Sequence, residues 1–539
     1  MPRLPRRRAL VRALLSLPAF ALLVAAATPS PADARPDDER RRHKMAAPSP
    51  SSVVYDFEMD AVAGEMGATP GGAQDIAFFR SRVAAGEIPH PNVFTPEGLF
   101  SEHDLPLRTT TRCAQLFCAA GEAIPAGLMV QPEVRYLAQL GFNSGLDPKT
   151  WRRAPIHVVA VIDKSGSMSG QPLDLVKESL IQALDHMNPD DQLSIVLYGD
   201  RAHVYMNPTA IRDRKAVARA IGGIQSDGST AMEEGLKVGF DLARRSQRSF
   251  QGTTRVMLFT DERPNVGATD AASFMGMARD ASKSGIGMTT VGVGVQFGAE
   301  LATAISSVRG GNLFFFPDAG KMKKVFEEDF DTMVTELAYD LRLEIKPEKG
   351  LKLAGVYGIP GKALEWTKEG SIKLSIETIF LSRKKGAIYV ALASDTRPGL
   401  PETRVTSGSP VATVKLAYTQ RGGGAQSTVV SLPTVTADAA SIGLQRGRIL
   451  VDQATTLAKA ASLHHEKNDQ EGAYQLVHAL AGLLRQSPDS DLAEERTMVQ
   501  ELERTLAKLS GHAGEPAPIA AHSEIDRISG LPLKRPAVD

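Results

Sequence analysis

Residues 156–340 alternate between short apolar runs and stretches of helical periodicity, and this alternation constrains the fold more than any other feature. The apolar runs are IHVVAVI, QLSIVLY, TRVMLFT, GMTTVGVGV and NLFFF. The helical patterns cover Leu173–Met187, Met232–Ala243, Ala271–Lys283 and Met322–Tyr339. Strands that are apolar at every position are buried on both faces, and helices between them favour right-handed crossovers. The pattern predicts an α/β fold with a doubly wound, mainly parallel sheet.

Other patterns flank this segment. Runs such as SIKLSIETIFL and AIYVALA predict an antiparallel β domain with one wetter face. A helical period then returns as three amphipathic helices, broken at Asn468-Asp469 and Ser487-Pro488. The predicted division is a signal peptide (1–34), a disordered linker (35–52), an N-terminal α+β region packing on the next two domains (53–153), the α/β domain (154–340), the antiparallel β domain (341–440), a helical segment (441–511) and a flexible tail (512–539).

The N-terminus predicts export. Several arginines precede an apolar run, Ala13–Ala27, and the small-x-small pattern Ala32-Asp33-Ala34 follows. These three parts in order are typical of a secretory signal, cleaved here after Ala34, which would leave the protein in the periplasm or outside the cell. A membrane anchor is the alternative, but this run is short for the ~30 Å of hydrocarbon in a bilayer, and no later stretch resembles a membrane span.

Charge and cysteine content narrow the function classes. The chain has 62 Lys+Arg and 62 Asp+Glu, and a general nucleic-acid binder would need a basic excess. Its two cysteines, Cys113 and Cys118, stand close together in CAQLFC. In an oxidising compartment we expect them to form a disulfide; the alternative is a reduced pair in a core.

Oxygen-bearing side chains gather where predicted strands end. Asp163-Lys164-Ser165-Gly166-Ser167 follows IHVVAVI, and Asp261 follows TRVMLFT. Asp227-Gly228-Ser229-Thr230 opens the helical pattern between them. Each segment taken singly suits a turn, because Asp, Ser and Gly are common there. In an open α/β sheet, however, ligands bind at the carboxyl ends of the strands, so we expect these three loops to meet.

Hydroxyls and carboxylates without sulfur or imidazole favour a hard cation. We expect Mg²⁺, with Mn²⁺ or Ca²⁺ as alternatives. Five side chains, some acting through water, would leave a coordination position for an outside ligand, and a carboxylate of a partner protein would fit it. The pattern therefore predicts a metal-bridged binding face.

The segments VVAVIDKSGSMSG, GSTAMEEGLK and VMLFTDERPNVG resemble the three metal-site segments of the von Willebrand factor type A domain. The resemblance covers roughly residues 154–340 and implies a metal-ion-dependent adhesion site. Thr230 matches better than Ser229 because it stands five residues before Gly235-Leu236. Matched residue by residue, the implied metal ligands are Asp163, Ser165, Ser167, Thr230 and Asp261.

Two positions depart from the family pattern. Lys164 replaces a more frequent small residue, and it would either attract an acidic ligand or be a solvated loop lysine. Glu262 stands where members often have glycine, and its carboxylate would either raise cation affinity or repel an acidic partner. Both are candidates for the ligand face.

The segments before and after residues 154–340 indicate which members of the family this chain resembles. Residues 76–100 resemble the stretch ahead of the A domain in exported bacterial proteins labelled calcium-activated chloride channel homologues. The β domain and helical tail are similar to these proteins and, more distantly, to inter-alpha-trypsin inhibitor heavy chains. A channel would need a bilayer-spanning segment, which the predicted mature chain lacks.

These features predict an exported, non-enzymatic protein that binds a divalent cation and captures a carboxylate of a partner protein. An envelope assembly or chaperone-like factor, holding clients through the β domain and helical tail, is the alternative. A metal-dependent hydrolase is a third reading, but the sequence offers no convincing general base. The sequence does not indicate the oligomeric state.

Overall fold

The computed structural model describes residues 67–70, 73–74, 76–91, 93, 95–107, 113–147, 149–261, 270–293, 308–316, 319–359, 364–395 and 405–512. These residues lie in one compact unit, Met59–Asp539. The predicted signal peptide, linker and Glu262 lie outside the described residues, as does all but the first residue of the predicted tail.

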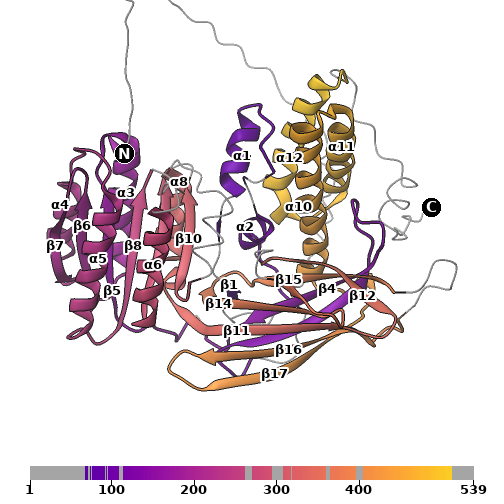
Figure 1. The fold of residues 1–539 in the computed structure, drawn as a ribbon, viewed down its shortest axis with the longest axis horizontal. Coiled ribbons are helices and arrows are strands. Elements are labelled where there is room, and N and C mark those ends of the chain that lie inside the picture. Colours follow the sequence, from indigo (N-terminus) through magenta and orange to yellow (C-terminus); the bar gives the residue numbers. More distant parts are fainter. Residues whose placement is uncertain are drawn as a thin grey trace, which may run out of the picture. The chain divides into compact units, whose positions relative to one another are not determined.

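The first sheet is doubly wound, as predicted. Its strand order is β2-β10-β9-β8-β5-β6-β7, with parallel pairing throughout except between β6 and β7. Figure 1 shows β7 and β10 toward opposite sides of this segment. Strands β5, β8 and β9 are almost completely buried, because helices cover both faces. The strands are β2 (Ala73–Gln74), β5 (Ile156–Asp163), β6 (Gln192–Tyr198), β7 (Ala202–Ala210), β8 (Thr253–Thr260), β9 (Ile286–Val293) and β10 (Gly311–Phe316).

Two apolar layers hold the helices on this sheet. Val158 and Ala160 of β5 face a core with α3, α4, α8 and α9, whereas Val159 and Val161 face α5 and α6. This alternation follows from the period of two along a strand. The helices are α3 (Gln171–His186), α4 (Arg214–Gly222), α5 (Met232–Gln247), α6 (Asp270–Lys283), α8 (Ala319–Glu328) and α9 (Phe330–Met333).

The second sheet is antiparallel, and it contains strands from both sides of the α/β segment. Its main order is β12-β15-β4-β1-β14-β11-β16-β17, with β3 on β4 and β13 on β14. The early strands are β1 (Gly67–Pro70), β3 (Cys118–Pro125) and β4 (Val134–Asn143). The late ones are β11 (Glu336–Pro347), β12 (Leu351–Tyr357), β13 (Leu364–Trp366), β14 (Ile372–Ser382), β15 (Ala387–Ser394), β16 (Pro410–Gln420) and β17 (Ala425–Pro433).

This sheet has the predicted wetter face. In β14, Leu374 and Ile376 are buried in an apolar core while Lys373 is exposed. The register aligns Lys373 with Glu344 of β11, which in turn aligns with Lys415 of β16. Opposite charges therefore alternate across neighbouring strands on the outer face, a favourable cross-strand arrangement.

Three helices follow the sheet, with breaks where the sequence predicts them. They are α10 (Ile442–Lys467), α11 (Gln470–Gln486) and α12 (Ala493–Leu509). Asn468 ends α10 in the left-handed conformation (φ 52°), and the Asp469 side chain accepts a hydrogen bond from the Gly472 N–H at 2.8 Å, which begins α11. These helices share a core with strands β4 and β15 and with helices α1 (Ile76–Ala84) and α2 (Pro96–Ser101).

The structure corrects the end of one predicted helix and confirms the predicted disulfide. The helical pattern Met322–Tyr339 is wrong at its end, because Glu336–Tyr339 pair with β14 as part of β11. Non-local pairing here prevails over local periodicity. The predicted disulfide between Cys113 and Cys118 is present, with Cα atoms 5.9 Å apart.

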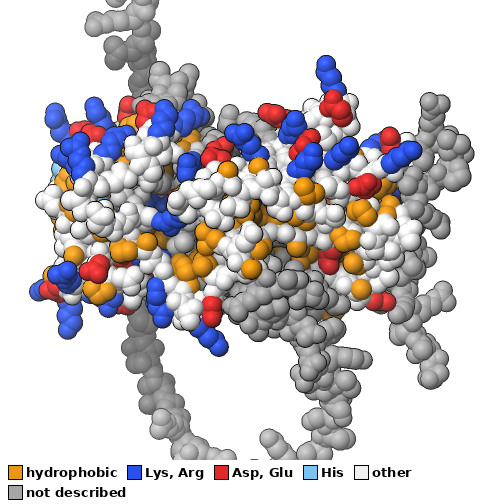
Figure 2. Space-filling view, turned by 90° about the horizontal axis from the view of Figure 1, so that it is seen from below, with side chains coloured by type: hydrophobic (Ala, Val, Ile, Leu, Met, Phe, Trp, Pro, Cys, Tyr) orange, Lys and Arg blue, Asp and Glu red, His pale blue; other side chains and the backbone are white. Residues whose placement is uncertain are grey.

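Helix length and surface charge also bear on the predictions from the sequence. None of the helices in the described ranges has the length and apolar character needed to traverse a bilayer. On the face shown in Figure 2, Lys and Arg side chains lie among Asp and Glu side chains, in keeping with the equal totals of 62 and 62.

Candidate metal centre

The loop after β5 brings predicted ligands together. The Ser165 N–H donates to Asp163 Oδ1 at 2.9 Å, and residues Gly166–Met168 then form a 3₁₀ turn. The Ser165 and Ser167 hydroxyl oxygens are 3.0 Å apart, and the Ser167 hydroxyl donates to Asp261 Oδ1 at 3.0 Å. The Ser165 and Ser167 hydroxyls therefore link the loop after β5 to Asp261, the residue that follows β8.

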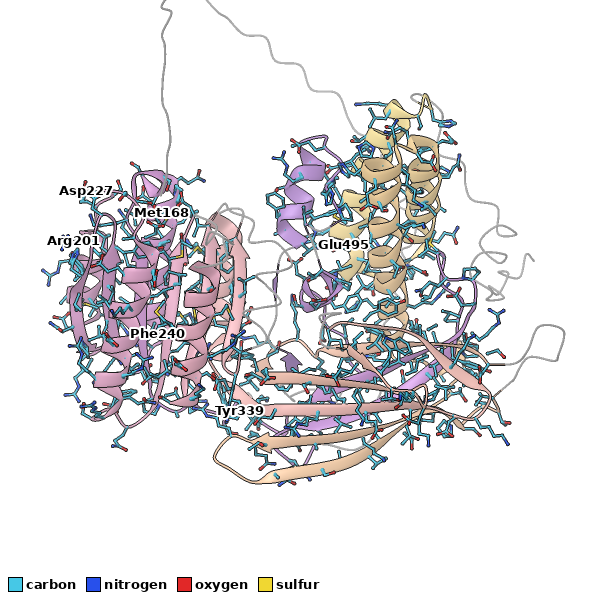
Figure 3. All side chains as sticks on the ribbon, viewed as in Figure 1. Met168, Arg201, Asp227, Phe240, Tyr339 and Glu495 are labelled. Atoms are coloured by element: carbon cyan, nitrogen blue, oxygen red, sulfur yellow. A yellow bond between two sulfur atoms is a disulfide. The ribbon has the colours of Figure 1, made fainter. Side chains whose placement is uncertain are left out.

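The Thr230 loop is joined to this first loop through the main chain. The Asp227 N–H donates to the Lys164 carbonyl at 2.6 Å, and the Gly166 N–H donates to the Gly228 carbonyl at 3.1 Å. Figure 3 labels Met168 and Asp227 at the same end of the α/β segment, while Phe240 lies further along it. Thr230 thus follows a segment that is fastened to the loop carrying the two serines.

Asp163 is fully buried, yet its partners are all neutral donors. Its Oδ2 accepts hydrogen bonds from the Tyr198 hydroxyl at 3.1 Å and the Thr260 hydroxyl at 2.9 Å. Within the described residues, no Lys, Arg or His side chain pairs with it. Buried carboxylates are otherwise paired or bound to metals, because an isolated buried charge is costly.

The Lys164 ammonium faces the Asp227 loop. Its Nζ donates to the Asp227 carbonyl at 3.0 Å and lies 3.6 Å from Asp227 Oδ2. The side chain is 15% exposed, so it is largely packed. In this arrangement Lys164 links two loops of the centre.

Ser229, next to Thr230, is hydrogen-bonded to Asp200 of a neighbouring loop. The Ser229 N–H and hydroxyl both donate to Asp200 Oδ1 at 2.8 Å. These two bonds, with a further contribution from Lys164, lower the pKa of Asp200 below its usual value. The Ser229 hydroxyl therefore links the Thr230 loop to the Asp200 loop.

Sequence reasoning missed Tyr198, Thr260 and Asp200. Tyr198 and Thr260 are the last residues of β6 and β8, where side chains project at the carboxyl edge of the sheet. A hydroxyl-bearing residue at the last position of a predicted strand was the available signal. That both hydroxyls donate to Asp163 could not be predicted without knowing the strand order.

The donor set fits a hard divalent cation. The residues described at this edge contribute carboxylate and hydroxyl oxygens, the ligands that Mg²⁺ prefers. Asp163, Ser165, Ser167 and Asp261 are connected directly or through one another, and Thr230 follows the attached loop. A cation held here would act as a Lewis acid toward an outside oxygen ligand.

Several known proteins are similar to part of this chain. An uncharacterized protein of Synechocystis is 29% identical over 204 residues, which are 38% of this chain and 48% of that protein. The uncharacterized protein YfbK of Escherichia coli is 26% identical over 238 residues, 42% of this chain and 41% of its own length. Human inter-alpha-trypsin inhibitor heavy chain H4 is 29% identical over 154 residues, 27% of this chain and 17% of its own. Each match spans less than half of the relative.

Among solved structures, a von Willebrand factor type A protein from Catenulispora acidiphila is similar at a TM-score of 0.45 and 16% identity, covering 74% of this chain and 91% of that one. The model of the von Willebrand factor type A domain matches residues 157–328. These residues contain the first sheet from β5 to β10 and all three loops of the candidate centre. The chain therefore contains a von Willebrand factor type A domain, with distant similarity to inter-alpha-trypsin inhibitor heavy chains.

Proposed function

We propose that this chain is an exported, non-enzymatic binding protein whose type A domain holds Mg²⁺ and captures a carboxylate of a partner protein. The metal ligands are Asp163, Ser165, Ser167, Thr230 and Asp261, acting directly or through water. The type A family commonly mediates metal-dependent protein interactions, and the finer assignment rests on this centre.

The burial of the Asp163 carboxyl group among neutral hydrogen-bond donors carries the proposal. This carboxylate is fully buried among neutral donors, and the nearby Lys164 ammonium is engaged with the Asp227 loop. A divalent cation beside Asp163 and Asp261 would offset the buried charge and remain electrophilic. Thr230 is taken as the fifth ligand from the resemblance to the type A metal-site segments, because it stands five residues before Gly235-Leu236.

Cation binding is tested by titrating Mg²⁺ into EDTA-stripped protein in a calorimeter. We expect saturable binding to the wild type and loss of binding in Asp261→Asn. At a hundredfold excess over Kd, the cation should stabilise the wild type by about 2.7 kcal/mol. The control is Asp280→Asn on α6, an exposed carboxylate paired with Lys283, which should bind Mg²⁺ normally. Equal binding by Asp261→Asn, or none by the wild type, would refute the centre.

Carboxylate capture requires a second experiment. Wild-type and Asp261→Asn proteins are used as baits in envelope extract, with Mg²⁺ or EDTA. A partner under this proposal is retained by the wild type in Mg²⁺, released by EDTA, and lost when its contacting carboxylate is amidated. A partner insensitive to both EDTA and amidation would contradict the proposed chemistry.

The alternative is an envelope assembly or chaperone-like factor that binds clients through the β domain and the helical tail. Its helical part would require an uncovered apolar face on α10–α12. Most of the apolar residues of these helices instead pack in one core with β4, β15 and the early helices. We therefore favour the metal centre as the binding site. The proposed export is tested by sequencing the N-terminus of the exported protein. We expect the mature chain to begin at Arg35.

A further inference from the structure

We propose that Tyr198, the last residue of β6, is a positioning residue of the metal centre although it is not a ligand. This inference rests on the proposed metal binding and adds the element that holds the ligands in place. Tyr198 contacts Asp163, the loop that follows Asp163, and the helix that follows Thr230, each through a different part of the residue.

The hydroxyl of Tyr198 orients the Asp163 carboxylate. It donates to Oδ2 at 3.1 Å, beside the Thr260 hydroxyl at 2.9 Å, while Oδ1 accepts the Ser165 N–H at 2.9 Å. Three donors from three segments prevent the carboxylate from rotating. A carboxylate has about four acceptor positions, so Oδ1 retains capacity toward the cation or its water.

The ring of Tyr198 sets how closely α5 approaches the sheet. Gly235 lies in the first turn of α5, and a Cβ at this position would be 2.6 Å from Tyr198 Cδ1. Glycine is therefore required for the helix to rest on the ring. Since α5 begins directly after the Thr230 loop, the buried ring determines where that loop ends.

The main chain of Tyr198 and of the next residue, Gly199, completes the arrangement. The Lys164 N–H donates to the Tyr198 carbonyl at 2.9 Å, and the Ala231 N–H donates to the Gly199 carbonyl at 2.9 Å. The end of β6 is thus bonded to both ligand-bearing loops. Hydroxyl, ring and main chain together make it the common support of the centre.

The test is Tyr198→Phe, measured by calorimetric titration of EDTA-stripped protein with MgCl₂. The substitution keeps the ring against Gly235 and removes the hydroxyl, so the near-ultraviolet circular dichroism of the fold should persist. We expect the Mg²⁺ Kd to rise by 10-fold or more, the usual effect of removing an outer partner of a metal ligand.

The matched control is Tyr205→Phe. Tyr205 lies on the neighbouring strand β7, and its hydroxyl donates to a carbonyl, that of Ala220, at 2.9 Å. This variant loses one hydrogen bond in the same domain without touching Asp163. Its Mg²⁺ affinity should equal that of the wild type.

A second pair of variants keeps the inference testable should Tyr198→Phe fail to fold. Thr260→Val removes the other hydroxyl from Asp163 Oδ2, whereas Thr260→Ser retains it. We expect Thr260→Val to weaken Mg²⁺ binding by about 10-fold and Thr260→Ser to restore it. A merely structural role would lower the stability of both the metal-free and the metal-bound forms and leave affinity unchanged.

The outcomes separate this inference from the proposed function. If the wild type binds Mg²⁺ and Tyr198→Phe binds it equally well, the positioning role is overturned and the metal centre stands. If Tyr198→Phe is unfolded and Thr260→Val binds like the wild type, the role is likewise overturned. If the wild type binds no Mg²⁺, the proposed function itself fails.

Discussion

Two fully buried aspartates, Asp163 and Asp452, differ in the number of hydrogen bonds that their carboxyl groups accept. Asp163 receives three hydrogen bonds, whereas the Oδ1 atom of Asp452 accepts one, from the Met129 N–H at 2.7 Å. Among the described groups, Asp452 Oδ2 has no hydrogen-bond partner. Burial raises the pKa of Asp452 to about 6, partly opposed by Arg448 and by the Met129 bond. Burial of this kind favours the protonated, neutral form of the carboxyl group.

The first prediction concerns Asp452→Asn and pH. A raised folded-state pKa means that the folded protein binds more protons than the unfolded chain between about pH 4 and pH 6, so wild-type stability falls as pH rises through this window. Asparagine removes this dependence. As pH rises from 4 to 7.5, the free energy of unfolding of the variant should increase by about 2–3 kcal/mol relative to that of the wild type.

Urea unfolding at both pH values measures this difference. The exposed Asp395→Asn variant is the control and should track the wild type. A constant gap between Asp452→Asn and the wild type across the pH range would contradict the assignment.

At the scale of the elements, a buried ionic network joins the early helices to α12. Glu495 of α12 pairs with Arg80 of α1, accepts from Gln453 of α10, and lies 3.3 Å from His103 Nε2. Although burial opposes its charge, the bonds to His103 and Arg80 lower the pKa of Glu495 to about 2. Burial likewise opposes the charge on His103, yet the bonds to Asp491 and Glu495 raise its pKa. Helices far apart in sequence are therefore held by mutually neutralised charges.

Glu495→Gln should destabilise the protein at neutral pH by about 3 kcal/mol, because Arg80 and His103 lose their buried counter-charge. A depressed folded-state pKa contributes stability that is present above pH 4.5 and lost as pH falls toward 2. The difference in free energy of unfolding between this variant and the wild type should therefore become smaller below pH 4. Denaturant unfolding monitored by helical circular dichroism measures it.

The adjacent Glu494→Gln is a close control. Its carboxylate is 3.5 Å from Arg80 but 67% exposed, so its loss should cost at most about 0.5 kcal/mol. Equal effects of the two substitutions would mean that burial is not the source of the stabilisation.

At the scale of the whole molecule, the type A domain interrupts a sheet. Strands β4 and β1 lie between β15 and β14 in the strand order, yet they precede the domain in the chain. The segment after the domain therefore lacks two interior strands of its own sheet. Its strands can pair completely only when both flanks of the domain are present.

A fragment of residues 335–512 should consequently fail to unfold cooperatively, whereas residues 59–512 should show a cooperative transition. Without β1 and β4, the edges of β14 and β15 are open and the apolar core is incomplete. Circular dichroism during urea titration distinguishes the two. Cooperative unfolding of the shorter fragment would indicate an independent domain.

Much of this organisation is predictable because it depends on local pattern. The buried parallel strands follow from runs such as IHVVAVI, and the three terminal helices from a helical period with breaks at Asn468 and Pro488. The loop motif likewise places hydroxyls and carboxylates at strand ends. Where local pattern and pairing compete, prediction fails, as at Glu336–Tyr339, which joined β11 instead of a helix.

The sequence by itself determined the α/β class of the type A segment, the wetter face of the antiparallel strands, and which oxygen-bearing residues stand at strand ends. Only the tertiary structure decided that β1, β3 and β4 join the late strands, and that Tyr198 and Thr260 hold Asp163. The reason is physical. Periodicity reports the environment of each residue along its own element, whereas strand order and a hydroxyl's partner depend on contacts between residues such as Thr260 and Asp163, 97 positions apart in the chain.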